Sequence, residues 1–242
     1  MSEHDKEVEI IEDDVVESCE LNISGIKILM LLTEVDRFDE HHKTGVWFEE
    51  FAIPYLKFLD EGFDVTVATI HGKESPIDPA SDNLIEDIKW HMAKEALKKP
   101  EKLSDINCAY YDAVVIPGGH GPLYDLADSE DVGQTLLSFY EQSKLIAAIC
   151  HGPAALLSAK RNGIPMVKGY ELTSFTSEEE IEAKKEKLVP FSVEDKLKEA
   201  GANFVKNAPG DIYIVEDRNF ITGQNYQSAK AFTDTIIKYL SK

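Results

Sequence analysis

The residues best placed to do chemistry are Cys150 and His151, which follow an apolar run and precede a Gly-Pro pair. The run, residues 145–149, is typical of a strand covered on both faces, and the Gly-Pro pair is typical of a helix start. A sharp strand-to-helix turn tolerates only small residues two positions either side of its nucleophile, and Ala148 and Gly152 stand there. The pattern predicts a nucleophile elbow in which helix amides favour the Cys150 thiolate. The competing interpretation is an inert cysteine at the end of a strand.

A further strand is expected at residues 112–117, and it leads directly into Gly118, Gly119 and His120. The carboxyl ends of parallel strands meet at one edge of a sheet, so we expect this turn to face the elbow across a pocket. Glycines let backbone N–H groups approach a reacting oxygen closely, and the amides of Gly119 and His151 are the candidate oxyanion donors. A phosphate-binding loop is the alternative, but the chain has neither a G-x-x-x-x-G-K-[ST] nor a G-x-G-x-x-G sequence there.

The distribution of histidines narrows the choice of mechanism. None follows position 151, whereas triad glutamine amidotransferases and papain-like proteases need a histidine well after the nucleophile. His151 must therefore serve as the base, and residues 178–180 offer three carboxylates to orient it. The same three glutamates also fit the exposed, acidic first turn of a helix capped at Thr176 or Ser177. The seven histidines are His4, His41, His42, His71, His91, His120 and His151.

Length and composition indicate the setting in which this chemistry takes place. The chain has 242 residues, 43% of them hydrophobic, and alternating strand and helix patterns, which predict one α/β domain with a parallel, doubly wound sheet. Three cysteines, Cys19, Cys108 and Cys150, at unrelated spacings with no secretory signal ahead of them argue against a disulfide framework or a zinc motif and favour a cytoplasmic protein. The net charge of −20 and the lack of a long apolar run disfavour nucleic acid and membranes as partners.

The chain pattern divides into a tail and one domain. Residues 1–22 form an acidic tail, since nine acids stand against one lysine in the first twenty positions, and residues 23–242 form the domain. Within it, residues 70–106 are an insertion that caps one edge, with a helix over 83–98 whose apolar face includes Leu84, Ile88 and Met92. Further strands are expected at 26–32 and 63–69. A helix is expected to begin near Gly45, to be kinked by Pro54 and to end at Gly62, and another is expected to be capped by Ser129.

Motifs along most of the chain together resemble the ThiJ/PfpI superfamily, which has a class I glutamine amidotransferase-like fold. The resemblance is strongest to its branch of heat-shock chaperones and glutathione-independent glyoxalases (glyoxalase III). The motifs are, in chain order, Lys43-Thr44-Gly45-Val46 with Glu50, Pro117-Gly118-Gly119-His120-Gly121, Ala147-Ala148-Ile149-Cys150-His151-Gly152-Pro153, Phe175-Thr176 with Glu180, Val189-Pro190-Phe191 to Asp195, and Thr222-Gly223-Gln224-Asn225.

The resemblance implies a flavodoxin-like sandwich and assigns roles to individual residues. Cys150 is the nucleophile, His151 the histidine and Glu180 the carboxylate of a triad, while Glu50 corresponds to a glutamate that leans on the cysteine. A protonated Glu50 would stabilise the thiolate without adding a like charge. Glu178 and Glu179 are then expected to be exposed acids of little consequence.

The implied activity is conversion of methylglyoxal, a small 2-oxoaldehyde, to lactate through a Cys150 hemithioacetal. No organic cofactor is required. Relatives can hold a metal near the pocket, and His41-His42 lies near the expected rim, but the sequence assigns no metal ligand. A homodimer is expected by analogy with relatives.

Two alternatives stay open. One is another cysteine chemistry of the superfamily, protein deglycase or peptidase-like hydrolysis. The other is a stress-response holdase chaperone in which Cys150 is a redox sensor.

Overall fold

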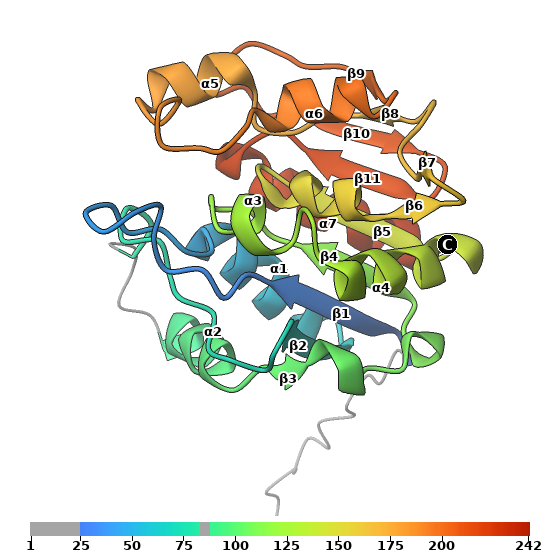
Figure 1. The fold of residues 1–242 in the computed structure, drawn as a ribbon. Coiled ribbons are helices and arrows are strands. Elements are labelled where there is room, and N and C mark those ends of the chain that lie inside the picture. Colours follow the sequence, from blue (N-terminus) through green and yellow to red (C-terminus); the bar gives the residue numbers. More distant parts are fainter. Residues whose placement is uncertain (1–24, 83–87) are drawn as a thin grey trace, which may run out of the picture.

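The computed structural model describes residues 25–82 and 88–242, so the expectations for the acidic tail, Cys19 and Leu84 lie outside the described residues. A seven-stranded sheet runs through the molecule in the order β10-β11-β5-β4-β1-β2-β3 (Figure 1). All neighbouring strands are parallel except β10, which pairs antiparallel with β11. The strands are β1 Lys27–Leu32, β2 Asp64–Thr69, β3 Glu101–Lys102, β4 Ala113–Ile116, β5 Leu145–Ile149, β10 Ile214–Asp217 and β11 Phe220–Gly223.

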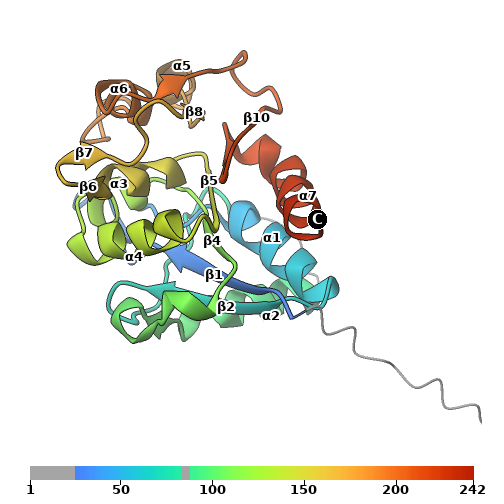
Figure 2. The same ribbon diagram turned by 90° about the vertical axis from the view of Figure 1, so that its right-hand side faces the viewer.

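Helices cover both faces of this sheet, which makes an α/β sandwich (Figure 2). Helices α1 (Phe48–Asp60), α2 (Ile88–Lys98) and α7 (Ala229–Leu240) lie on one side. The other side carries α3 (Pro122–Asp125), α4 (Glu130–Glu141), α6 (Val193–Glu199) and the 3₁₀ helix η3 (Gly152–Ser158). The remaining elements are η1 Leu103–Asp105, η2 Cys108–Tyr110, β6 Lys160–Arg161, β7 Ile164–Pro165, β8 Glu171–Leu172, α5 Ser177–Glu182, β9 Asn203–Phe204 and η4 Tyr226–Ser228. None of the described helices is long and apolar enough to cross a membrane.

The central strands are buried on both faces, as their continuous apolar sequences predict. In β1, Leu29 and Leu31 enter one core, while Ile28, Met30 and Leu32 enter the other. Successive side chains of a strand point to opposite faces, so an uninterrupted apolar run needs cover on both. Because β1, β4 and β5 pair in parallel, their carboxyl ends lie side by side at one rim of the sheet.

The first helix differs in its start from the expectation. Helix α1 begins at Phe48 rather than near Gly45, because the Val46 backbone is hydrogen-bonded to Pro76 and Asp78. Pro54 lies inside the helix, and Gly62, at φ 75°, follows its end. The Gly62 and Phe63 amides donate to the carbonyls of Leu59 and Phe58, the pattern of a Schellman motif.

The segment at residues 70–106 adds β3 beside β2 and packs α2 against α1. The prediction of which face of α2 is buried was wrong. Ile88 and Met92 are 80% and 54% exposed, whereas Ala93 and Leu97 are buried. Ala93 and Leu97 are four residues apart and so share one face, which is the face that the neighbouring elements cover.

Candidate active site

Cys150 lies at the turn between β5 and η3, and its backbone has the strained geometry of an elbow. Its φ is 59°, a left-handed value that a non-glycine residue adopts only when its surroundings enforce it. Two hydrogen bonds do so here: the Cys150 amide donates to Gly223 and its carbonyl accepts from Phe175. A Cβ on Gly152 would stand 2.2 Å from the Ile116 carbonyl oxygen, which explains why the turn needs a small residue there. The helix that follows is 3₁₀ rather than α.

The imidazole of His151 connects the cysteine to a carboxylate. Its Nδ1 lies 3.4 Å from Cys150 Sγ, and its Nε2 lies 2.7 Å from Glu180 Oε2. A carboxylate only accepts, so the ring carries its proton on Nε2 and presents a lone pair on Nδ1 to the sulfur. The three residues assigned from the sequence therefore lie together in one chain of contacts.

Glu180 also accepts a hydrogen bond from His120, which the sequence did not predict. His120 Nε2 lies 2.8 Å from Glu180 Oε1. Burial alone would raise the pKa of Glu180, but the hydrogen bonds from the two imidazoles outweigh it and lower the pKa to about 2. Burial and, to a smaller extent, the nearby His151 together lower the pKa of His120 to about 4, although the hydrogen bond to Glu180 acts in the opposite direction. At neutral pH the cluster thus contains a carboxylate with a neutral His120 beside it.

Glu50 is fully buried and contacts the sulfur of Cys150. Its Oε2 accepts a 2.7 Å hydrogen bond from the Gly118 amide, so that amide is committed to Glu50 rather than free for an oxyanion. Burial raises the pKa of Glu50 to about 8, against the effects of its contacts with Cys150 and Gly118. At neutral pH Glu50 is mostly protonated.

The surroundings of Cys150 oppose its ionisation, in contrast to the expected helix effect. Burial raises the pKa of the thiol well above its usual value, and negative charge on Glu50 raises it further. The amide of Gly119 acts in the opposite direction by donating a hydrogen bond to the sulfur. Gly119 has a φ of 81°, and a Cβ there would stand 2.1 Å from the Gly45 carbonyl oxygen, so only glycine fits. The resting cysteine is a thiol with His151 placed to take its proton.

The three consecutive glutamates of α5 differ in burial and in their hydrogen bonds. Glu178 is exposed, as expected, but the expectation that Glu179 is an exposed acid was wrong, since it is 5% exposed. Its Oε2 accepts from the Thr176 amide and hydroxyl, and its Oε1 accepts from Gly210, Gln224 and Asn225. The Thr-x-x-Glu spacing of a capping box is the sequence signal that predicts this burial.

A cavity of about 210 Å³ opens beside the sulfur. Besides the predicted residues, its walls include groups that the sequence analysis did not single out. The lining residues beyond the predicted site residues are Trp47, Asp78, Ala80, Phe175, Ala183, Lys185 and Tyr226, of which only Phe175 belongs to a motif quoted above. They come from five separate segments of the chain, so no local sequence pattern predicts that they share one cavity.

Of the described residues, the potential metal-binding group is His120, His151 and Glu180, whose donor atoms lie within 4.8 Å of one another. A divalent ion there would replace the two imidazole protons that Glu180 now accepts. His41 and His42, by contrast, are exposed, and His42 Nδ1 contacts Asp39 at 2.8 Å.

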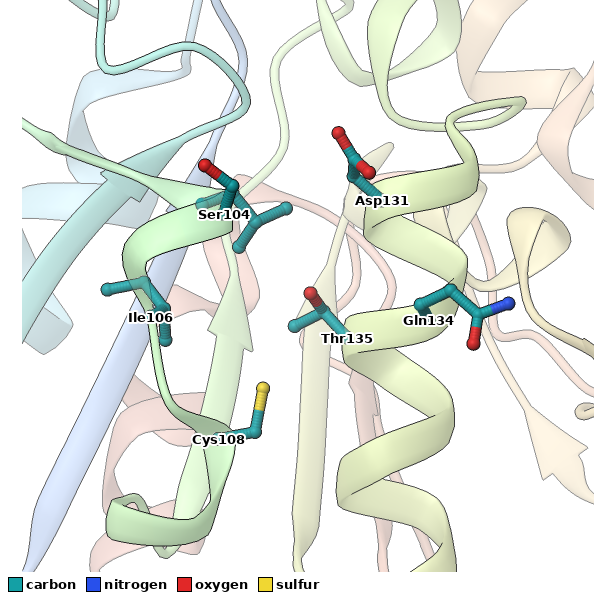
Figure 3. A pocket seen from close by; sticks show the side chains of 7 residues that line it. Ser104, Ile106, Cys108, Asp131, Gln134 and Thr135 are labelled. Atoms are coloured by element: carbon teal, nitrogen blue, oxygen red, sulfur yellow. The ribbon is translucent and has the colours of Figure 1, made fainter.

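Cys108 lies away from this site in a second hollow of about 260 Å³ (Figure 3). Figure 3 shows its sulfur facing α4, which contributes Asp131, Gln134 and Thr135. No histidine is among the residues that line this hollow within the described part of the chain.

The family model that matches the chain is described as the DJ-1/PfpI family and covers residues 43–239. The chain belongs to the DJ-1/PfpI family. It is 30% identical to the probable glutathione-independent glyoxalase hsp3103 of Schizosaccharomyces pombe, over 84% of this chain and 93% of that protein.

Two further relatives are informative. Glyoxalase 3 of Candida albicans is 28% identical, over 88% of this chain and 97% of that protein, and the crystal structure of that organism's glyoxalase III superposes with a TM-score of 0.76 at 26% identity, covering 88% of this chain and 97% of that one. The protein/nucleic acid deglycase HchA of Staphylococcus aureus is 35% identical over 62% of this chain and 56% of its own length. The match to the glyoxalase III structure confirms the expected fold class, and the relatives as a group confirm the resemblance to the superfamily near its glyoxalase III branch.

Proposed function

We propose that the protein is a glutathione-independent glyoxalase that converts methylglyoxal to lactate. The observation that carries the proposal is the line of contacts from Cys150 Sγ through His151 to Glu180, with Glu50 buried against the same sulfur. Similarity to two relatives named as glyoxalases supports the choice of reaction.

The first step is addition of the thiol to the aldehyde. His151 Nδ1 takes the proton from Cys150 Sγ, and the imidazolium that forms is stabilised by the charged Glu180. The sulfur bonds to the aldehyde carbon, and the carbonyl oxygen receives the proton to give a hemithioacetal. The His151 amide is the candidate donor to the oxygen while it carries negative charge, and the Gly119 amide, which donates to the sulfur at rest, becomes a second donor only once that hydrogen bond is given up.

The second step moves hydrogen between the two carbons of the substrate. A base removes the proton from the carbon bound to sulfur, an enediol forms, and the neighbouring carbon is reprotonated. His151 or Glu50 serves as the shuttle, and a Glu50 with a pKa of about 8 can both give and take a proton near neutral pH. One carbon is oxidised and the other reduced, so no external oxidant is needed.

The last step is hydrolysis. The product of the transfer is a thioester of lactate with Cys150, and water cleaves it to lactate and the free thiol. The whole reaction adds one water to methylglyoxal and uses no organic cofactor.

The test is to incubate the purified protein with methylglyoxal in the absence of glutathione and to measure lactate. Stoichiometric conversion of methylglyoxal to lactate over many turnovers supports the proposal. Loss of methylglyoxal without lactate, or lactate formation only after glutathione is added, contradicts it.

The similarity to HchA favours a second candidate, removal of 2-oxoaldehyde adducts from proteins. The same thiol would then attack an adduct rather than the free aldehyde. Presenting a pre-formed arginine adduct of methylglyoxal beside free methylglyoxal separates the two: a glyoxalase prefers the free aldehyde, and a deglycase releases the arginine.

A further inference from the structure

The cavity at Cys150 is larger than methylglyoxal requires. Its volume is about 210 Å³, whereas a water molecule occupies about 30 Å³ of liquid. Methylglyoxal has five non-hydrogen atoms and would leave much of this space unfilled. This inference rests on the proposed function and concerns which 2-oxoaldehyde the site fits.

The wall of the cavity is built from aromatic rings. Trp47, directly before α1, and Tyr226, in η4 after β11, stack with their centroids 5.0 Å apart and their planes inclined by 29°. Phe175 also lines the cavity and packs on His151 at 4.6 Å. Its ring is thus engaged with the imidazole that faces the sulfur.

The Trp47–Tyr226 pair is not fully covered by the rest of the chain. Trp47 is half-buried and Tyr226 is 38% exposed. Large apolar groups left partly exposed beside a reactive sulfur offer stacking surface to a flat ligand. The two side chains come from distant parts of the sequence, and both line the cavity that holds Cys150.

The charged groups of the cavity are held by other partners. Asp78, the carboxylate that lines the cavity, accepts from the Thr44 hydroxyl and the Ala80 amide, each at 2.9 Å. Lys185 is the one cation among the described lining residues, and its Nζ lies 5.1 Å from the ring centroid of Phe38. The remaining surface is mainly apolar and suits a neutral substituent.

We propose that the site is specialised for 2-oxoaldehydes that carry an aryl or similarly flat apolar substituent, and that Trp47 and Tyr226 recognise this substituent. The aldehyde carbon would lie at Cys150 Sγ, and the ring would lie along the stacked pair. Trp47 and Tyr226 are then specificity-determining residues for the reaction.

The kinetic test compares phenylglyoxal with methylglyoxal at initial rates, with mandelate and lactate as the products measured. The wild type is expected to favour phenylglyoxal by about tenfold or more in kcat/KM, and Trp47→Ala or Tyr226→Ala is expected to reduce this ratio by about tenfold. Tyr110→Ala is the matched control, because Tyr110 is a 70% exposed tyrosine of η2 outside this cavity. An unchanged ratio in both wall variants overturns the inference.

Lys185→Met provides a second control. If the cavity were built instead for an anionic substituent, 4-carboxyphenylglyoxal would be preferred to phenylglyoxal and Lys185→Met would abolish that preference. That result would also overturn the inference.

A binding measurement separates this inference from the proposed function. In the Cys150→Ser protein, calorimetric titration is expected to show mandelate binding at least about tenfold tighter than lactate, with the difference lost in Cys150→Ser/Trp47→Ala. This result upholds the inference even if the wild type makes no lactate from methylglyoxal, which would defeat the proposed function alone. Equal affinities for mandelate and lactate overturn the inference even if lactate is made.

Discussion

The two cysteines in the described part of the chain both lie in hollows, and their settings differ in what surrounds the sulfur. Cys150 stands at the end of a central strand with φ 59°, and an imidazole, a buried carboxyl group and a glycine amide converge on it. Cys108 begins a short 3₁₀ helix and faces α4 across a hollow lined by Ser104, Asp131 and Thr135 (Figure 3). A hollow with a thiol is thus common to both. The difference is that Cys150 stands where β5 and its neighbouring strands end, so side chains and amides from several segments surround its sulfur.

The largest effect expected from this comparison is that of removing one sulfur or the other. Cys150→Ser should abolish lactate formation from methylglyoxal, because the hydroxyl is close in size to the thiol but far less acidic. Cys108→Ser, the matched control, should retain wild-type kcat and KM. Substantial turnover by folded Cys150→Ser would break the comparison, and so would loss of activity in folded Cys108→Ser.

The carboxylate behind His151 should have the next largest effect. In Glu180→Gln, one of the two imidazole N–H groups faces an amide NH₂ instead of an oxygen, and the imidazolium loses its charged partner. We expect kcat to fall by about 10²–10⁴-fold, the usual contribution of general acid–base catalysis, whose upper end is the loss seen when the acid of a triad is neutralised. Glu178→Gln, exposed on the same helix, should leave kcat unchanged. Equal losses of kcat in the two variants would show that Glu180 is not the carboxylate that orients His151.

Glu50 should give the protein a distinct pH dependence. Its pKa is raised from the ordinary 4.5 to about 8 by burial, so between these values the folded state binds more protons than the unfolded state. The free energy of unfolding contributed by Glu50 therefore falls as pH rises from about 4.5 to about 8, and is level above that.

Urea denaturation across this pH range measures the effect. Glu50→Gln keeps an oxygen for the Gly118 amide and cannot ionise, so its curve should lack this component of the decline. Identical pH profiles for the wild type and Glu50→Gln would show that Glu50 is charged in the folded protein at neutral pH.

Glu179 should affect stability more than chemistry. In Glu179→Gln one carboxylate oxygen becomes an NH₂ group that faces donors already present, from Thr176 on one side or from Gly210 and Asn225 on the other. The free energy of unfolding should fall by about 2–3 kcal/mol, the scale of losing a hydrogen bond to a charged group. Urea denaturation measures the loss, with Glu178→Gln as control. An unchanged midpoint would show that this network contributes nothing.

The predictable part of the fold and site is the part that local sequence encodes. The apolar runs of β1, β4 and β5 identify a sheet with both faces covered, and the small residues around Cys150 identify the elbow. The resemblance supplied Glu50 and Glu180, which spacing alone left among several acids. The structure places both at the elbow.

The rest depends on contacts between distant segments. The apolar residues Ile88 and Met92 gave a plausible helix face, but the neighbours of α2 cover a different one. Trp47 meets Tyr226 only after the chain has folded, and the burial that raises the pKa of Cys150 likewise belongs to the assembled site. A local helix-dipole argument therefore gave the opposite direction for that thiol.

The most direct test of the central claim, that the elbow makes Cys150 the group that reacts with 2-oxoaldehydes, compares the labelling of Cys108 and Cys150 in one sample. Native wild-type protein is treated with iodoacetamide, with and without methylglyoxal, and the labelling rates of the Cys108 and Cys150 peptides are measured by mass spectrometry. Methylglyoxal should slow the labelling of Cys150, because the hemithioacetal occupies its sulfur, and leave that of Cys108 unchanged. Equal slowing at both cysteines, or none at Cys150, would contradict the account.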